Sequence, residues 1–255
     1  MKALLCLLLV GCGSTGGGLV SFPVSASGPS DAQDPLSFTN GLGFSVTLTR
    51  ARLHIAAIYF TLAPPISGHG ETGCIEASSY TTEAFGPIDL DMLSPNALPF
   101  PRPGQALSVL SKNAEIWLAG SDINAASDST VILEVAGTAS KGGEEYPFTG
   151  SLTISTNRTA GQQTAALPGA NPICKQRIVS SIAIDVTPTS TGSLVLTVDP
   201  RGLFVNVDFS LLAPSPDQPL LYQFADEPTD LASVNLYAAM HSAYGVYGFR
   251  WLDHH

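Results

Sequence analysis

Three histidines, His54, His69 and His241, are the residues of this sequence best suited to bind a metal ion. An imidazole nitrogen is a good ligand for copper, zinc and nickel. We expect His54 in a strand, His69 in a Gly-His-Gly loop and His241 in a helix. No two of them have the spacing of a strand or helix metal site, so the alternative is that each is a hydrogen-bonded structural residue.

Calcium is a second metal that the sequence could accommodate, because carboxylate oxygens on loops are its preferred ligands. Asp and Asn are also common turn formers, since their side chains bond to nearby backbone, and we favour that interpretation. The acidic segments in question are Asp122, Asn124 and Asp128, then Asp89 and Asp91, and finally Asp226, Glu227 and Asp230.

Arg50 and Arg52 are expected on the same face of a strand as His54, where they could form a site for an anion or a partner. The more ordinary interpretation is that they pair with carboxylates of an adjacent strand. We favour the second, because the chain has 21 acidic residues against 11 Lys and Arg.

Aromatic residues near the end of the chain could stack on sugar rings. Tyr247, Phe249 and Trp251 alternate along the sequence, however, which favours a strand that faces the core. The remaining members of this set are Tyr237 and Tyr244.

No catalytic residue is predicted. The sequence has no Gly-x-Ser-x-Gly elbow, no His-Glu-x-x-His pair, no phosphate-binding loop and no dinucleotide-binding fingerprint. A catalytic triad assembled from distant Ser, His and Asp residues is not constrained by the sequence. We therefore expect a protein that is not an enzyme, with a hydrolase of envelope polymer as an alternative.

The chain begins with one cation, Lys2, followed by a short apolar run and small residues. This layout is typical of a secretory signal peptide and is too short to span a bilayer. The run ends in Leu-Val-Gly-Cys at residues 9–12, which resembles the lipobox of bacterial lipoproteins. The resemblance covers only the first dozen residues and implies that residues 1–11 are removed and that Cys12 carries a diacylglyceryl group. An ordinary secretory signal cut near Ala26 is the alternative.

The resemblance also bears on the other cysteines. Cys6 would leave with the signal and Cys12 would carry lipid, so Cys74 and Cys174 would remain as a pair in an oxidising compartment. We predict a disulfide between them, which closes a loop of about 100 residues and stabilises the fold by about 4–5 kcal/mol in the chain-entropy model. Two metal-binding or reactive thiols are the alternative.

Alternation of apolar and polar residues dominates from Leu36 onward, which predicts an all-β fold. We expect a single antiparallel β-sandwich, jelly-roll-like, over residues 36–255, with one short C-terminal helix. Residues 12–35 are rich in Gly, Ser and Pro and are expected to form a lipidated, flexible tether.

Individual elements follow from the same patterns. Alternation over 44–49 and again over 52–59 predicts strands, with Leu53, Ile55, Ala57 and Tyr59 on one face in the second run. A hairpin turn is expected at 141–145. A three-stranded antiparallel meander is expected over 178–209. A helix over 229–243 precedes a closing strand over 247–251.

Composition and charge narrow the function. The formal net charge is −10 and no basic stripe is present, which argues against nucleic acid and against attraction to anionic lipid. Membrane contact is expected through the N-terminal lipid alone, and Gly13, in place of an Asp, implies the outer membrane. We expect a non-catalytic envelope lipoprotein that binds an unknown envelope protein or glycan and needs no cofactor. A periplasmic or surface protein that binds copper, zinc or calcium is the alternative.

Overall fold

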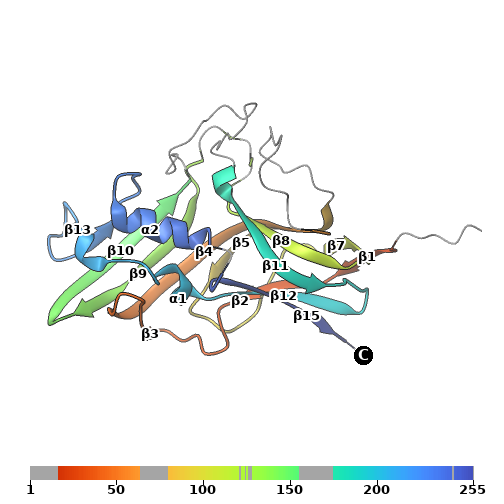
Figure 1. Cartoon of the computed structure of the whole chain (residues 1–255), viewed down its shortest axis with the longest axis horizontal. Helices are drawn as coiled ribbons and strands as arrows, with labels where there is room; N and C mark the ends of the chain where they lie inside the picture. Colours follow the sequence, from red (N-terminus) through yellow and green to blue (C-terminus); the bar gives the residue numbers. More distant parts are fainter. Residues whose placement is uncertain are drawn as a thin grey trace, which may run out of the picture.

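A computed structural model describes residues 17–63, 80–120, 122, 123, 125, 128–154, 175–242 and 244–254. Strands dominate these residues and form two sheets (Figure 1). None of the helices in this described part is long and apolar enough to cross a membrane. The larger sheet has eleven described strands: β1 (Leu19–Phe22), β3 (Leu36–Thr39), β4 (Ser45–Thr61), β5 (Tyr80–Asp91), β7 (Gly104–Leu107), β8 (Ser111–Trp117), β9 (Val131–Lys141), β10 (Glu144–Thr153), β11 (Ile178–Val186), β13 (Ala213–Pro214) and β14 (Tyr222–Phe224).

The smaller sheet and the helices complete the described elements. The strand order of the smaller sheet is β15-β12-β2-β6, in which β12 pairs antiparallel with β15 and parallel with β2. Its strands are β2 (Val24–Ser27), β6 (Leu98–Pro99), β12 (Gly192–Val198) and β15 (Tyr247–Asp253). The helices are α1 (Pro200–Leu203) and α2 (Leu231–Met240), with the 3-10 turns η1 (Lys175–Arg177) and η2 (Phe209–Leu211).

The all-β sandwich with one short C-terminal helix is confirmed. The parallel pairs β10–β14 and β12–β2 show, however, that the sandwich is not purely antiparallel. The hairpin turn is confirmed between β9 and β10, where Gly142 and Gly143 have φ of 64° and 94°. Only glycine adopts such angles without strain at both positions of a tight hairpin turn.

The central element of the larger sheet is β4, which is paired along both edges. One edge pairs with β9 over residues 45–53 and then with β8 over 57–61. The other edge pairs with β3 over 45–48 and then with β5 over 52–61. The 17 residues of β4 therefore run through the middle of the sheet and carry side chains to both of its faces.

An irregularity in β4 changes which residues face the core. The pairing with β5 shifts register between Ile55 and Ala57, as a β-bulge does. Before the shift Leu53 and Ile55 are fully buried, and after it Ile58 and Phe60 are. The prediction that Tyr59 shares the face of Leu53 and Ile55 is therefore wrong, because the extra residue of the bulge reverses the alternation.

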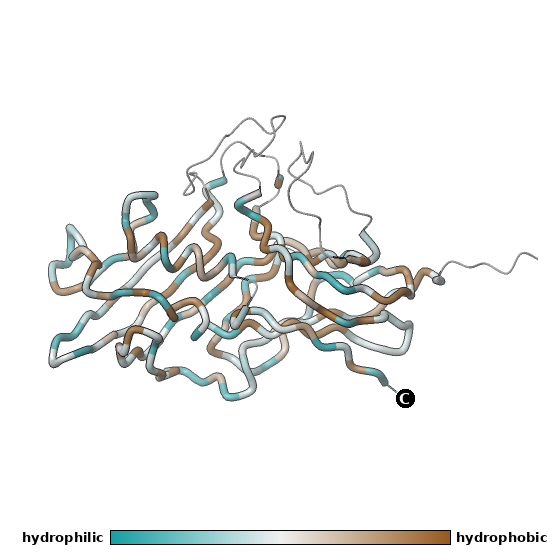
Figure 2. Tube along the Cα trace, viewed as in Figure 1, coloured by the Kyte–Doolittle hydropathy of each residue, from teal (hydrophilic) through white to brown (hydrophobic). Residues whose placement is uncertain are grey.

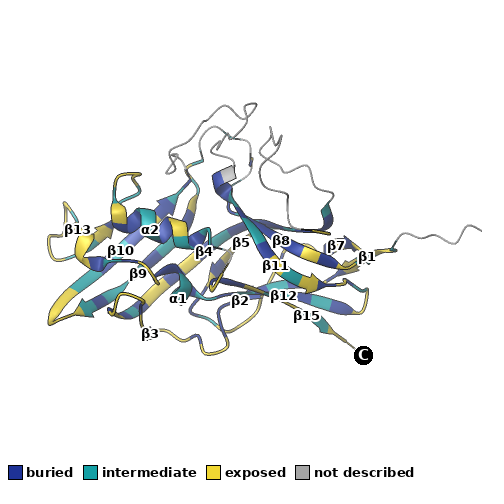
Figure 3. Ribbon diagram, viewed as in Figure 1, coloured by how far each residue is buried: buried dark blue, intermediate teal, exposed yellow. Residues whose placement is uncertain are grey.

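The core lies on one face of the larger sheet, which we call the inner face. Toward one end of the sheet it packs against the smaller sheet, where the rings of Phe60 and Phe249 lie 5.5 Å apart. Toward the other end it packs against the segment of α1 and η2, where the rings of Phe148 and Phe209 lie 5.0 Å apart. Hydrophobic and buried residues alternate with polar and exposed ones along the strands (Figures 2 and 3).

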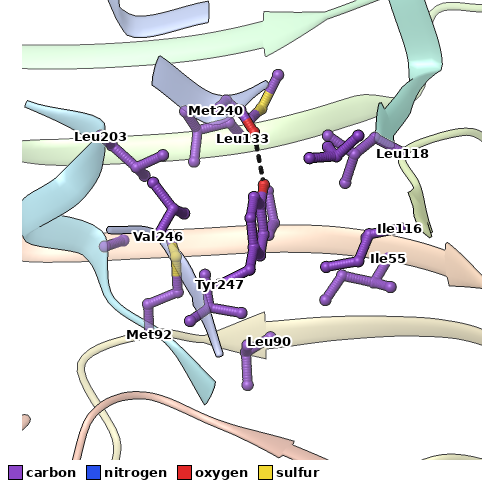
Figure 4. Packing of buried hydrophobic residues seen from close by; sticks show 14 of the residues in the cluster. Ile55, Leu90, Met92, Ile116, Leu118, Leu133, Leu203, Met240, Val246 and Tyr247 are labelled. Atoms are coloured by element: carbon purple, nitrogen blue, oxygen red, sulfur yellow. Dashed lines mark hydrogen bonds between the residues drawn. The ribbon is translucent and has the colours of Figure 1, made fainter. Parts of the chain in front are cut away.

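Helix α2 also covers the inner face. Its Met240 belongs to the same buried cluster as Leu133 of β9, and the Tyr247 hydroxyl donates a hydrogen bond of 2.7 Å to the Met240 carbonyl within the core (Figure 4). Burial raises the pKa of Tyr247 far above its usual value, so the phenol stays protonated and can donate. The helix was predicted over 229–243; it begins after Asp230, whose side chain caps it by accepting from the Ser233 N–H.

Two sequence predictions about the strands are wrong. Residues 19–27, expected within the flexible tether, form β1 and β2, which pair with β7 and β12 respectively. The predicted meander over 178–209 is not formed, because β11 and β12 lie in different sheets. The segment predicted as its third strand, 203–209, instead holds the end of α1, a turn and the start of η2. Helix α1 starts where Asp199 accepts from the Arg201 N–H and Pro200 occupies the first turn.

Candidate ligand site on the outer face of the larger sheet

The face of the larger sheet opposite the core, which we call the outer face, carries a hollow of about 700 Å³ across β5, β4 and β8. Ala57 of β4 lies directly between Phe85 of β5 and Trp117 of β8 in the pairing register. The small alanine leaves space between the two large rings. The described residues that line the hollow are His54, Ala56, Ala57, Tyr59, Phe85, Gly86, Pro87, Trp117, Ala119, Gly120, Asp122, Ile123 and Thr130.

The β-bulge of β4 shapes the floor of this hollow. Both Ala56 and Ala57 line it, because the bulge adds an unpaired residue at this point. Gly86 of β5 lies so close to the bulge that an added Cβ would meet the Ile55 carbonyl oxygen at 2.5 Å and the Ala56 carbonyl oxygen at 2.9 Å. A glycine is therefore required for the two strands to approach here.

Tyr59 of β4 contacts three other aromatic rings, those of Tyr80, Phe85 and Trp117, and we call these four rings the aromatic cluster. Tyr59, Phe85 and Trp117 line the hollow, and Tyr80 lies outside its lining. Tyr59 is central, with ring centroids 4.4 Å from Trp117, 4.7 Å from Tyr80 and 6.0 Å from Phe85. The Tyr59 and Phe85 planes are nearly perpendicular, at 83°. Phe85 is 39% exposed, so this cluster, unlike the core, reaches solvent.

Two carboxylates flank Tyr59. Glu83 of β5 and Glu115 of β8 are its direct cross-strand neighbours. Glu115 is fully buried and accepts from the Tyr80 hydroxyl at 3.1 Å and from the Trp117 indole N–H at 3.4 Å. One carboxylate thus holds two rings of the cluster in place. Burial raises the pKa of Tyr59, and the charges of Glu83 and Glu115 raise it further.

His54 lies at the margin of the hollow and is paired with an acid. Its Nδ1 is 2.7 Å from the Asp89 carboxylate of β5. With that carboxylate as acceptor, geometry assigns the ring proton to Nδ1. The other ring nitrogen, Nε2, is covered and has no hydrogen-bond partner among the described residues. His54 is therefore bonded to a neighbouring strand, as the structural interpretation expected.

A smaller hollow of about 330 Å³ adjoins His54 and contains the two arginines. Arg50 Nη2 is 2.6 Å from Glu134 of β9, and Arg52 faces Glu134 and Asp91 in the register of the neighbouring strands. The prediction that these arginines pair with carboxylates of an adjacent strand is confirmed for Arg50.

His241 lies elsewhere. It follows Met240, which packs in the core on the inner face of the sheet (Figure 4). His54 instead lines the hollow on the outer face. The His241 ring lies 4.7 Å from that of Tyr237, and burial lowers its pKa to about 4. His69 lies outside the described residues. Within the described part of the chain no three His, Cys, Asp or Glu residues are grouped as a metal site, and His54 and His241, on opposite sides of the sheet, are not brought together.

The acidic segments act mainly as turn and cap residues, as the favoured interpretation expected. Asp128 accepts from the Gly120 and Thr130 N–H groups. Burial raises the pKa of this carboxyl, but the hydrogen bonds lower it by more, so the pKa lies below its usual value. Asp91 accepts from the Leu93 N–H. Asp226 accepts from Thr153, and Asp230 caps α2. Asn124 lies outside the described residues.

The aromatic residues near the end of the chain belong to the core, except one. Tyr237 and Tyr247 are buried, and Phe249 and Trp251 pack against the core. Tyr244 is 85% exposed. The prediction that Tyr247, Phe249 and Trp251 face the core is confirmed. The aromatic cluster on the outer face was not predicted from the sequence.

The predicted lipidation residue and disulfide pair, Cys12, Cys74 and Cys174, lie outside the described residues. Comparison with known proteins adds little. No protein-family model and no curated protein sequence matches the chain. Among solved structures, "MbnP from Methylosinus trichosporium" is similar at 11% identity over 80% of this chain and 85% of that one, with a TM-score of 0.35. A similarity at this level carries no conclusion about function.

Proposed function

We propose that this protein is a non-catalytic binding module of the cell envelope, which holds a small ligand in the hollow on the outer face of its larger sheet. The observation that carries the proposal is the aromatic cluster, three of whose rings, Tyr59, Phe85 and Trp117, line the hollow on the face opposite the core, with Phe85 exposed to solvent. A hollow of a few hundred Å³ with apolar rings and a few polar groups is typical of small-ligand sites.

Ligand-observed NMR with a set of small sugars, amines and amino acids tests the binding proposal. Phe85→Ala removes an exposed wall of the hollow, and Tyr244→Ala removes an exposed ring elsewhere as the matched control. We expect compounds that bind the wild type and the Tyr244 variant to lose binding to the Phe85 variant. Equal binding to all three proteins, or to none of them, would contradict the proposal.

Attachment to the membrane is part of the same proposal. It rests on the resemblance of residues 9–12 to a lipobox, which implies acyl chains on Cys12. Acyl chains together on one residue meet the requirement for stable anchoring, and Gly13 favours the outer membrane. Cys12→Ser is expected to move the protein from the pelleted membrane to the soluble fraction; continued pelleting would refute the anchor.

A Cys74–Cys174 disulfide is proposed to close the body of the protein in the oxidising envelope. Peptide mapping without reductant is expected to recover the two cysteines in one cross-linked peptide. Recovery of both as free thiols would overturn this part.

A metal site at His54 is the second candidate function. The observation that favours it is the carboxylate–histidine pair with Asp89, which resembles the outer-shell arrangement of many metal-ligating histidines. Because Nε2 is covered, its neighbours would have to move for copper or zinc to reach it. Elemental analysis of untagged protein after dialysis against copper, zinc and calcium tests this. Metal retained by the wild type and His241→Ala but lost in His54→Ala would support it, and no retained metal would remove it.

A further inference from the structure

We propose that the edge of the larger sheet formed by β1 and β7 rests on the lipid bilayer and inserts exposed leucine side chains among the lipids. This inference goes beyond the ligand site and rests on the membrane anchor of the proposed function, because it takes Cys12 as the acylated residue. Two observations carry it. Apolar side chains are exposed at this edge, and only a short length of chain separates Cys12 from the sheet.

Three leucines are exposed at this edge, and we call them the leucine patch: Leu19, Leu107 and Leu110. They are 74%, 44% and 45% exposed. Leu19 of β1 and Leu107 of β7 are direct partners in an antiparallel pair, so their side chains lie next to each other on one face of the sheet. Both line a shallow hollow of about 180 Å³. Leu110 follows the turn after β7, where the Val109 N–H donates to the Leu107 carbonyl at 2.8 Å.

The chain between Cys12 and the sheet is short enough to keep this edge near the membrane. The described fold begins at Gly17, where an added Cβ would meet the Ser108 carbonyl oxygen at 2.5 Å, and the Gly18 carbonyl accepts from the Ser108 N–H at 2.9 Å. The chain from Cys12 to Gly17 therefore spans at most about 18 Å in any conformation. The polar layer on each side of a bilayer is roughly 5–8 Å thick. The leucine patch thus remains within reach of the lipids.

The charges beside the patch favour an apolar contact over an electrostatic one. Glu83 lines the same hollow as Leu19 and Leu107, so this edge has no attraction for anionic headgroups. Lys112 of β8, just after the patch in sequence, is 2.8 Å from the Asp185 carboxylate, which balances its charge. The contact therefore comes from the burial of leucine side chains at the boundary between headgroups and acyl chains. We expect it to persist at high salt, which screens exposed charges.

Vesicles of phosphatidylcholine with brominated acyl chains test the contact, because bromine quenches tryptophan fluorescence only at close range. The full lipidated chain, purified from membranes, is reconstituted into these vesicles. Leu107→Trp adds a reporter to the leucine patch. Leu220→Trp is the matched control, because Leu220 is 87% exposed in the segment between β13 and β14, and β13 lies at the opposite end of the molecule from β1 (Figure 1). Relative to the wild type, we expect added quenching and a blue shift for Leu107→Trp alone.

A charge variant separates contact with the lipids from mere proximity to the anchor. Leu19→Asp places a carboxylate directly opposite residue 107, and the burial of a charge among lipids is unfavourable. Combined with Leu107→Trp, it is expected to remove most of the added quenching. Leu220→Asp combined with Leu107→Trp is the control and should leave the quenching unchanged. Quenching that Leu19→Asp also leaves unchanged would overturn the inference, since proximity to the anchor would then account for it.

The remaining outcomes separate this inference from the proposed function. Equal quenching of Leu107→Trp and Leu220→Trp, or no quenching of either in a protein that floats with the vesicles, would overturn the inference and leave the anchor in place. A blue shift without quenching that grows with protein concentration would assign the patch to a second copy of the chain and would also overturn it. A protein that does not float with the vesicles would overturn the anchor of the proposed function as well.

Discussion

The two faces of β4 are built from neighbouring residues and serve different purposes. On the inner face Ile55, Ile58 and Phe60 are fully buried and pack into the core. On the outer face His54 and Tyr59 bond or stack with groups from adjacent strands and line a hollow. Burial is therefore concentrated on one side of the sheet, which leaves the side chains of the other side available to hold a ligand.

Truncation on the inner face should cause the largest loss of stability. Ile55→Ala is expected to lower the free energy of unfolding by about 2–5 kcal/mol, because it removes fully buried methyl groups and leaves a cavity. Phe85→Ala on the outer face, where the ring is partly exposed, should cost much less. Chemical denaturation measures the free energy of unfolding of both variants. A larger loss in the Phe85 variant than in the Ile55 variant would contradict the distinction between the two faces.

His241 on the inner side makes stability depend on pH. Its pKa is about 4 in the folded protein, against 6.5 for an unperturbed histidine. Between these values the unfolded chain binds more protons, so this contribution to stability is full above pH 6.5 and is lost as the pH falls toward 4. The loss is expected to reach about 3 kcal/mol.

Denaturation of the wild type and of His241→Gln at several pH values isolates this effect, since contributions of the carboxylates are common to both proteins. The variant should lose less stability between pH 6.5 and 4. Parallel pH profiles would show that His241 is not held neutral by burial.

A smaller effect is expected from the single hydrogen bond inside the core. Tyr247→Phe leaves the buried Met240 carbonyl without its donor and should cost about 1–2 kcal/mol. The measurement is again the free energy of unfolding. An unchanged value would mean that the ring alone, without its hydroxyl, accounts for the packing seen in Figure 4.

The smallest effect is expected for the ion pair on the outer face. Arg50 and Glu134 are both partly exposed, and exposed pairs contribute about 0.2–1 kcal/mol. A double-mutant cycle with Arg50→Ala and Glu134→Ala should give a coupling within that range that shrinks at high salt. A coupling as large as the effect of Ile55→Ala would remove the distinction between the faces.

Sequence patterns predicted the local features of this comparison. Alternation identified the outward face of Arg50, Arg52 and His54, and the excess of acids predicted the pairing of Arg50 with a carboxylate. Two consecutive glycines predicted the hairpin turn, and Gly142 and Gly143 do adopt positive φ there. These features depend on neighbours in sequence or on one adjacent strand.

Features that depend on distant pairing were missed. The sequence around β2 has the composition of a coil, yet β2 lies between two strands from later in the chain, β12 and β6. The Leu194 N–H donates to the Pro23 carbonyl and the Phe100 N–H donates to the Val24 carbonyl. The aromatic cluster likewise needs three strands in one register. The apolar–polar alternation of the sequence continues unchanged through Ala56 and Ala57, so it does not reveal the bulge there. The placement of Tyr59 on the outer face could therefore not be predicted.

An NMR spectrum of the two tryptophan indole N–H groups tests the central claim most directly. Trp117 lines the hollow, and Trp251 packs against Phe22 in the region of the smaller sheet. A compound that binds the protein should shift the Trp117 signal and leave the Trp251 signal in place. Binding that shifts Trp251 alone, or that shifts neither, would place the ligand elsewhere and contradict the assignment of binding to the outer face.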